Sequence, residues 1–187
     1  MKSFITASFL AFLLTVLSVS AQEFSSTSLK RDPKLQVQKL SILRTTAASR
    51  KYQTLLAVVI ATDLGELLDH SGPFTVFAPS DLAFEKLSGT SLADLMNPDN
   101  KEEFKALLSY HIVAGKFSAS KILKALSRGS GKTTFTSLQG GIITATMEGI
   151  DIVLSDSFGN KATIVVADVN QQNGIIHEID AVIRPEK

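Results

Sequence analysis

One segment near the C-terminal end of the chain decides the fold prediction: Asn173-Gly174-Ile175-Ile176-His177-Glu178-Ile179-Asp180-Ala181-Val182-Ile183. Asparagine and glycine both tolerate a positive φ, so the pair Asn173-Gly174 predicts a tight turn immediately before a strand. Side chains alternate along a strand. One face then carries Ile175, His177, Ile179, Ala181 and Ile183, and the other carries Ile176, Glu178, Asp180, Val182 and Arg184. The segment therefore predicts a buried strand with one histidine in an apolar row.

That histidine, His177, permits two interpretations. It can be a neutral core histidine whose ring nitrogens are hydrogen-bonded, or it can be a metal ligand or general base. Glu178 and Asp180 point to the opposite face of the strand, so the three side chains cannot converge on one metal ion. The pattern favours the structural interpretation and predicts no metal site.

Before this strand, the spacing of apolar residues changes along the chain. Up to Gly131, apolar residues recur at helical spacing, as in Tyr52, Leu55, Leu56, Val59 and Ile60. After it the period is two, which predicts strands at 133–136, 142–147, 150–154, 161–168 and 174–183. Helices followed by strands with short connections predict an α+β fold and not a parallel doubly wound sheet.

One strand is expected earlier, at Phe74–Ala78, because the segment is β-branched and aromatic. Pro79-Ser80-Asp81 ends it, and Ser80 or Asp81 is suited to cap the next helix. The helix with Phe104, Leu107 and Leu108 inside is expected to start near Asn97-Pro98. Another helix is expected to start at Ser118 or Ser120.

Tyr110-His111-Ile112 follows the helix that contains Phe104 and enters an extended segment. Adjacent strand residues point to opposite faces, so Tyr110 and His111 are expected to divide, one inward and one outward. Tyr110 has the larger apolar body and is expected to be buried, which leaves His111 partly exposed. The segment is either a binding surface or a core element with a hydrogen-bonded tyrosine hydroxyl.

Two blocks of the sequence resemble the conserved blocks of fasciclin domains. They are GPFTVFAPSDLAF at residues 72–84 and NGIIHEIDAVI at residues 173–183. Tyr110-His111 and Leu138-Gln139-Gly140 resemble family segments between them, and the resemblance covers roughly residues 50–185. Seven residues of the two blocks are expected to have a structural role: Phe77, Pro79, Asp81, Asn173, Gly174, His177 and Asp180.

The resemblance implies a two-sheet β-wedge or sandwich with helices packed along one edge. It also implies an extracellular or cell-surface setting and a role in adhesion or matrix contact, without a catalytic site or cofactor. Family adhesive activity has often been placed at the tyrosine–histidine segment, so Tyr110, His111 and Ile112 become the candidate binding residues. The implied partner is an extracellular or cell-surface protein or polysaccharide.

The N-terminal residues have the order of a secretory signal. Lys2 precedes an uncharged run from Phe4 to Val19, and Val19-Ser20-Ala21 offers small residues for cleavage after Ala21. The run of about 16 residues is short for a membrane span of roughly 20. We therefore expect a signal peptide at 1–21, a polar tether at 22–49, a fasciclin-type domain at 50–185 and no membrane insertion after cleavage.

Composition excludes several classes of function. The chain has no cysteine, so disulfides, thiolate metal sites and cysteine nucleophiles are ruled out. Loss of Lys2 with the signal would leave 18 basic and 18 acidic residues. Such a neutral chain, with basic residues scattered along it, predicts no binding to nucleic acid.

These observations favour an exported, single-domain, monomeric binding module that is secreted, periplasmic or held at the cell surface. Two rivals remain open. A carrier would hold a small apolar ligand in a closed pocket between the helices and the sheets. An enzyme would need convergent polar groups with shifted pKa values in a cleft.

Overall fold

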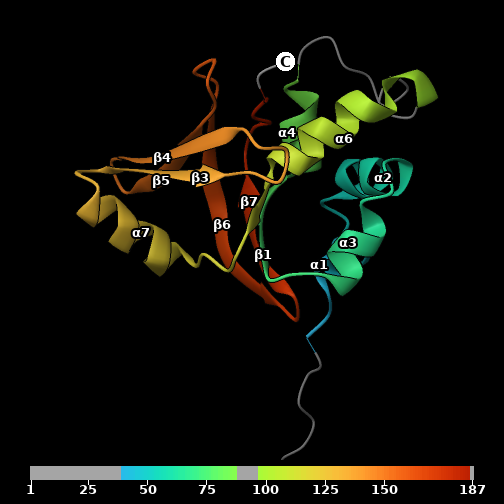
Figure 1. Cartoon of the computed structure of the whole chain (residues 1–187), viewed down its shortest axis with the longest axis horizontal. Helices are drawn as coiled ribbons and strands as arrows, with labels where there is room; N and C mark the ends of the chain where they lie inside the picture. The colour runs from blue at the N-terminus through green and yellow to red at the C-terminus, as the bar shows by residue number, and fades with distance from the viewer. Residues whose placement is uncertain (1–38, 88–96, 186–187) are drawn as a thin grey trace, which may run out of the picture. The chain divides into compact units, whose positions relative to one another are not determined.

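The computed structural model describes residues 39–87 and 97–185, which belong to one compact unit that spans Val37–Lys187 (Figure 1). Signal-peptide cleavage after Ala21 and the tether at 22–38 lie outside the described residues. The helices are α1 (Ile42–Ala48), α2 (Gln53–Ala61), α3 (Gly65–His70), α4 (Asp81–Glu85), η1 (Pro98–Asn100), α6 (Lys101–Tyr110) and α7 (Ala119–Arg128). The strands are β1 (Phe74–Pro79), β2 (Ile112–Ala114), β3 (Lys132–Thr136), β4 (Ile142–Glu148), β5 (Asp151–Ser155), β6 (Lys161–Gln171) and β7 (Gly174–Ile179).

The strands form a continuous ribbon in the order β2-β1-β7-β6-β5-β4-β3. Strand β6 is shared between two sheets, because its last part pairs with β7 and its first part with β5. Register shifts between Ile164 and Val169 mark where β6 bends from one sheet to the other. A bridge between Val113 and Ser137 brings the two ends of the ribbon together. The α+β fold with a two-sheet wedge is confirmed.

Strand β7 lies between β1 and β6 and is buried on both faces. One face, with Ile176 and beyond it Val182, packs on the core beneath α1, α2, α3 and α6. The other face, with Ile179 and beyond it Ile183, packs into the core between the two sheets. The predicted alternation therefore holds, although regular pairing ends at Ile179 and not at Ile183.

Strands β1 and β7 are parallel, from Phe74 opposite Gly174 to Pro79 opposite Ile179. The two blocks that resemble fasciclin motifs are therefore neighbours in the sheet. Most helices lie on one side of the ribbon, whereas α7 lies on the opposite side, beside β3 (Figure 1). The expectation that helices pack along one edge holds for all the described helices except α7.

Helix α1 is part of the domain, so the predicted tether at 22–49 is wrong for its last residues. Ser41 caps α1 by accepting a hydrogen bond from Arg44 N–H, and Ile42 is buried. The Ile42 N–H donates to Asn173 Oδ1 (2.9 Å), and the Thr45 hydroxyl donates to Gln171 Oε1 (2.6 Å). These partners are remote in sequence, so periodicity alone did not reveal the helix.

Candidate functional site

The motif residues of β1 and the following turn are structural anchors. Phe77 is fully buried and stacks on His177, with ring centroids 5.8 Å apart. Pro79 ends β1, and Ser80 caps α4 by accepting from Ala83 N–H. The Asp81 carboxylate accepts from Gln53 N–H (3.2 Å) and Thr54 N–H (2.8 Å). Asp81 therefore caps α2 from a distant part of the chain and favours the positive end of its dipole.

Asn173 ties the β6–β7 turn to two helices. Its amide donates to the carbonyl oxygens of Leu68 and Ser71, both at 2.8 Å, at the C-terminal end of α3. The predicted tight turn is present, but neither Asn173 nor Gly174 has a positive φ, so the reason given for it was wrong. Glycine is needed at 174 because a Cβ there would lie 2.1 Å from the Phe74 carbonyl oxygen.

His177 is completely buried, as predicted. Its Nδ1 accepts from Asp168 N–H (3.3 Å) and its Nε2 donates to the Phe117 carbonyl (2.8 Å). Burial lowers the pKa of the ring, so the neutral form is favoured. Both nitrogens are used in holding β6 and the segment before α7, which supports the structural interpretation. Asp180 likewise accepts from Thr163 N–H (2.7 Å) and links β7 to β6.

Tyr110 and His111 are both buried, each with 1% of its surface exposed, so the prediction that His111 faces solvent is wrong. The prediction assumed strand alternation. Tyr110 is instead the last residue of α6 and His111 is its C-cap, with helical φ and ψ, so the two side chains do not point to opposite faces. The strand begins at Ile112, which is also buried.

The His111 ring connects two segments. Its Nε2 accepts from Ile183 N–H (3.3 Å), so in the neutral ring Nδ1 carries the proton and donates to the Leu107 carbonyl (2.8 Å). The Tyr110 hydroxyl donates to the Ile142 carbonyl (2.6 Å), and its ring packs edge-on against His111. Together they fasten α6 to the chain beyond β7 and to the loop before β4.

An open groove of about 750 Å³ lies beside α6, and its lining includes Leu107, whose carbonyl His111 holds; neither Tyr110 nor His111 lines it. Its floor is apolar, with Phe104 and Leu107 from α6, and its rim is charged. His111 is hydrogen-bonded to Leu107, which lines the groove, and to Ile183, which directly precedes the lining residue Arg184. The remaining lining comes from Leu87, Glu103, Ala106, Gln139, Phe158, Asn160 and Pro185.

A buried carboxylate shapes the wall that carries Phe158. Asp156 accepts from the N–H groups of Phe158 (3.0 Å) and Asn160 (2.9 Å) within the β5–β6 connection. It also accepts from Arg184 N–H (2.8 Å), which joins that connection to the chain beyond β7. Phe158 projects from this wall with 64% of its surface exposed. Sequence reasoning missed the groove because its lining comes from five separate segments, although Leu138-Gln139-Gly140 was singled out.

The comparison of this chain with known proteins defines its class. Residues 50–185 match the Fasciclin domain family, so the chain belongs to that family. The solved FAS1 domain pair of the insect cell adhesion molecule Fasciclin I superposes with a TM-score of 0.68 at 20% identity, over 78% of this chain and 51% of that one.

Relatives with closer sequences span very different organisms. Protein sll1483 of Synechocystis is 38% identical over 146 residues, which cover 78% of this chain and 74% of the relative. Human periostin is 34% identical over 131 residues, which cover 70% of this chain but only 14% of periostin. The chain thus corresponds to most of the cyanobacterial protein and to a small part of periostin.

The burial of His111 predicts acid sensitivity. Burial lowers its pKa from the ordinary 6.5 to about 4, so between these values the unfolded chain binds a proton that the folded chain does not. The stabilising contribution is present above pH 6.5 and is lost as the pH falls toward 4, by about 3 kcal/mol in total. Burial of His177 acts in the same direction.

We therefore expect the free energy of unfolding of the domain to fall between pH 6.5 and 4. A His111→Gln variant should be less stable at pH 7 but should lose less stability over this interval. Urea unfolding at half-unit steps of pH measures both. Parallel pH profiles for the two proteins would contradict a neutral, buried His111.

Proposed function

We propose that the chain is an exported, non-catalytic binding module that contacts a matrix or cell-surface protein through the open groove beside α6. The observation that carries the proposal is the groove itself: an open apolar floor whose walls are fastened by the buried pair Tyr110 and His111. Tyr110, His111 and Ile112 then contribute to binding by positioning the walls and not by touching the partner.

The lining of the groove suits a protein segment. Phe104, Leu107 and Phe158 offer apolar surface for one or two inserted side chains, and aromatic anchors of this kind often dominate binding energy. Glu103 and Arg184 stand on the rim with opposite charges. A peptide segment with an apolar side chain between polar or charged neighbours complements both features.

A carrier of a small apolar ligand receives less support. That rival would place the ligand between the helices and the sheet, where Val59, Val76 and Ile112 meet. The cavity at this position offers a volume of only about 10 Å³, room for about one water molecule and far too little for an apolar ligand. The larger groove is open to solvent and has a charged rim, which favours a macromolecular partner.

Enzymatic function also receives little support from the described residues. His111 and His177 are buried with both ring nitrogens hydrogen-bonded, so neither is placed to move a proton to or from a substrate. Within residues 39–87 and 97–185, no group of three His, Asp or Glu side chains is arranged to hold a metal ion.

The setting of the module follows from the sequence and the family. Charge, apolar run and small residues up to Ala21 support export to a secreted, periplasmic or cell-surface location. The solved structure named for the cell adhesion molecule Fasciclin I supports an adhesive role. No helix in the described part of the chain is long and apolar enough to cross a membrane. We expect the module to act as a monomer.

Phe158→Asp should weaken binding of the module to its protein partner by roughly thirty-fold or more. The change replaces the most exposed aromatic side chain of the groove by a charge, and loss of a central anchor typically weakens binding by about 2 kcal/mol or more, roughly thirty-fold. The measurement is capture from solubilised extracellular matrix and cell-surface protein, followed by affinity determination for the captured protein.

Ile150→Asp is the matched control, because Ile150 is 92% exposed in the β4–β5 turn and does not line the groove. The control should bind as the wild type does. Equal binding by all three proteins would place the contact surface elsewhere and overturn the assignment of the groove.

A further inference from the structure

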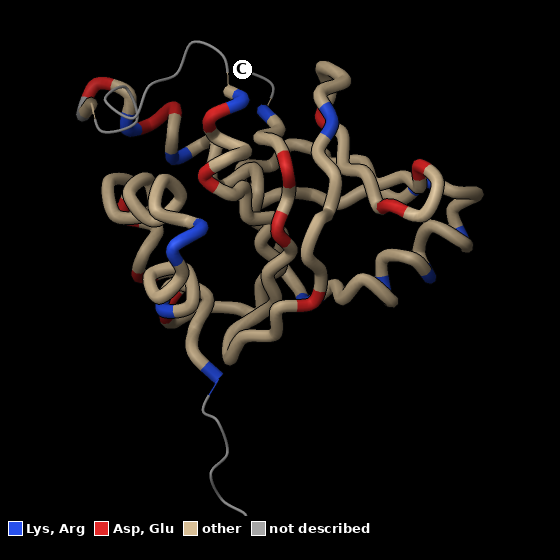
Figure 2. The backbone as a smooth tube through the Cα atoms, turned by 180° about the vertical axis from the view of Figure 1, so that it is seen from behind, with Lys and Arg blue, Asp and Glu red and all other residues tan. Residues whose placement is uncertain are grey.

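A second surface is defined by charge. Residues 104–147 contain six lysines and arginines and no aspartate or glutamate, although the whole chain is nearly neutral. The basic residues were expected to be scattered, and in this segment they are not. The fold turns most of them to one side of the domain, on α7 and the start of β3 (Figure 2).

Helix α7 is amphipathic. Ile122 and Leu126 are buried against the sheet, whereas Lys121, Lys124 and Arg128 follow one another on the solvent side at a spacing of three and four residues. At a rise of about 1.5 Å per residue, the row from Lys121 to Arg128 is about 10 Å long. The row borders a shallow groove of about 470 Å³ whose other side includes Lys132.

The cations of this groove lack acidic partners. Among the described residues no carboxylate forms an ion pair with Lys124, Arg128 or Lys132, although six ion pairs occur elsewhere. The acidic side chains on neighbouring segments are Glu148, Asp151, which is opposite it in β5, and Asp168. Glu148 pairs with Lys161, and Asp168 accepts from Ala119 N–H at the start of α7. Within the described residues, Lys124, Arg128 and Lys132 are therefore left without an ion-pair partner and are available to an anionic ligand.

The basic groove continues into a second groove of about 480 Å³ between α7 and β3, with which it shares Lys121, Ala125 and Thr133. Here the lining is aromatic and hydroxylated: Phe117, which packs on Phe135 with ring centroids 5.0 Å apart, and the threonines 133, 134 and 136. An apolar ring face beside hydroxyl groups suits the faces and hydroxyls of sugar rings.

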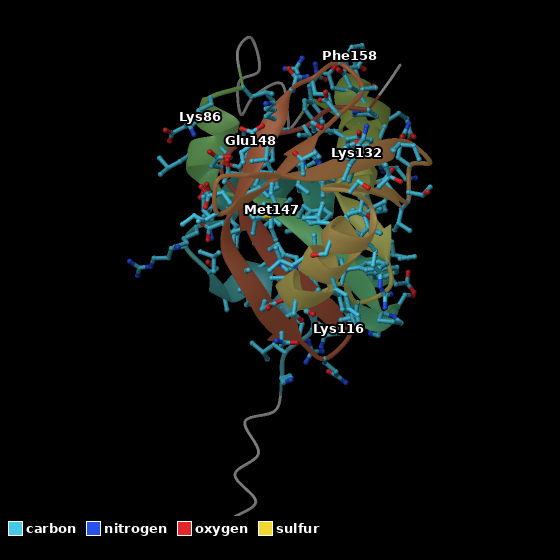
Figure 3. The ribbon with its side chains drawn as sticks, turned by 90° about the vertical axis from the view of Figure 1, so that its left-hand side faces the viewer. Lys86, Lys116, Lys132, Met147, Glu148 and Phe158 are labelled. Atoms are coloured by element: carbon cyan, nitrogen blue, oxygen red, sulfur yellow. The ribbon has the colours of Figure 1, made fainter. Side chains whose placement is uncertain are left out.

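We propose that α7 and β3 form a binding surface for an acidic polysaccharide, with carboxylate or sulfate groups on the basic row and sugar rings against Phe117 and the threonines. A row of cations matches a polymer with regularly repeated charge better than a single small anion. The threonine hydroxyls and the partly covered ring of Phe117 favour a sugar polymer over a bilayer, which would call for exposed apolar side chains to insert. This surface is separate from the groove at Phe158, because the two share no lining residue. Figure 3 shows Phe158 at the top of the view and Lys132, from the basic groove, below it.

The test uses the full mature domain and measures affinity for alginate and for dextran sulfate, with uncharged dextran as the neutral polymer. Wild type should bind at least one acidic polymer, should not bind dextran, and should lose affinity as salt is raised. Lys124→Glu with Arg128→Glu should weaken binding about ten-fold or more. The double variant Lys39→Glu with Arg50→Glu changes net charge equally on exposed residues outside this surface and should remain within about two-fold of wild type.

Three results would overturn the proposal. One is an equal loss of polysaccharide affinity in both double variants, which would show an effect of net charge alone. Another is stronger binding to phosphatidylglycerol vesicles or to single-stranded DNA than to both acidic polysaccharides. The third is absence of polysaccharide binding by folded wild type. Phe158→Asp should leave polysaccharide binding unchanged. The proposal of a polysaccharide surface and the proposal of a protein-binding groove can therefore be refuted independently.

Discussion

Replacing Gly174 by alanine should destabilise the domain by about 3–5 kcal/mol, within the range reserved for severe steric or packing defects. The new Cβ would lie 2.1 Å from the Phe74 carbonyl oxygen and 2.8 Å from Ile42 Cδ1. The first of these neighbours is backbone, so relief requires β1 and β7 to move apart. That movement breaks the central parallel pairing and loosens the contact with α1 at the same time.

Gly65→Ala provides the matched control. A Cβ at Gly65 would meet its nearest neighbour, Leu43 Cδ2, at 3.7 Å, which is ordinary contact, and alanine is the better helix former. This variant should be as stable as the wild type or slightly more so. Urea-unfolding midpoints of the three proteins measure the effect. A Gly174→Ala midpoint equal to that of Gly65→Ala would show that the sheet accommodates the methyl group.

Tyr110→Ala should also cost about 3–5 kcal/mol, because it removes a fully buried aromatic ring. The ring fills space against Gly141, where even a methyl group would lie 2.7 Å from Tyr110 Cε2. Tyr110→Phe keeps the ring and removes only the hydroxyl that donates to Ile142, so about 1 kcal/mol is expected. Thermal and urea unfolding of the two variants separate packing from hydrogen bonding.

The same two variants examine the link between the buried pair and the groove. Where Tyr110→Ala is still folded at low temperature, partner binding should be weaker than wild type, because α6 and the loop at Gln139 are no longer fastened. Tyr110→Phe should retain most of the binding. Full binding by a folded Tyr110→Ala domain would remove Tyr110 from the support of the groove.

Local patterns predicted most of the elements correctly because each element satisfies its own periodicity. The alternation of β7 leads to two buried faces, and Tyr52, Leu55 and Val59 of the row predicted for α2 are buried. For Ile60 of that row the prediction is wrong, because it is 68% exposed, whereas Val58 outside the row is buried. The caps Ser80 and Ser118 were also found, since an N-cap acts over three residues. These features depend on neighbours in sequence and can be read without knowing the fold.

The predictions from sequence were wrong where the residues that determine the local structure are distant in the sequence. Helix α1 has a single buried apolar side chain, Ile42, and is held by residues near 171–173. Gly174 looked like a turn glycine, whereas its requirement comes from Phe74 on another strand. His111 was expected on a strand with its side chain partly exposed. It is instead the C-cap of α6, and its side chain is buried.

The candidate sites were the least predictable part. Phe158, Arg184 and Gln139 meet at one groove only through the bend of β6 and the hydrogen bonds of Asp156 and His111. The basic row of α7 was visible in the sequence as a long stretch without acidic residues, but its significance depends on the absence of neighbouring carboxylates in space.

Strand β7 also determines how the domain would carry mechanical force. At its start, Gln172 N–H donates to the Leu40 carbonyl, beside the first described residues, and beyond its end Arg184 forms a wall of the groove. A pull between that N-terminal side and a partner held in the groove acts along β7 (Figure 1). The hydrogen bonds between the parallel strands β1 and β7 lie across this direction, so they are loaded in shear and must yield together. A module loaded in this way resists tension far better than one whose strands separate one bond at a time.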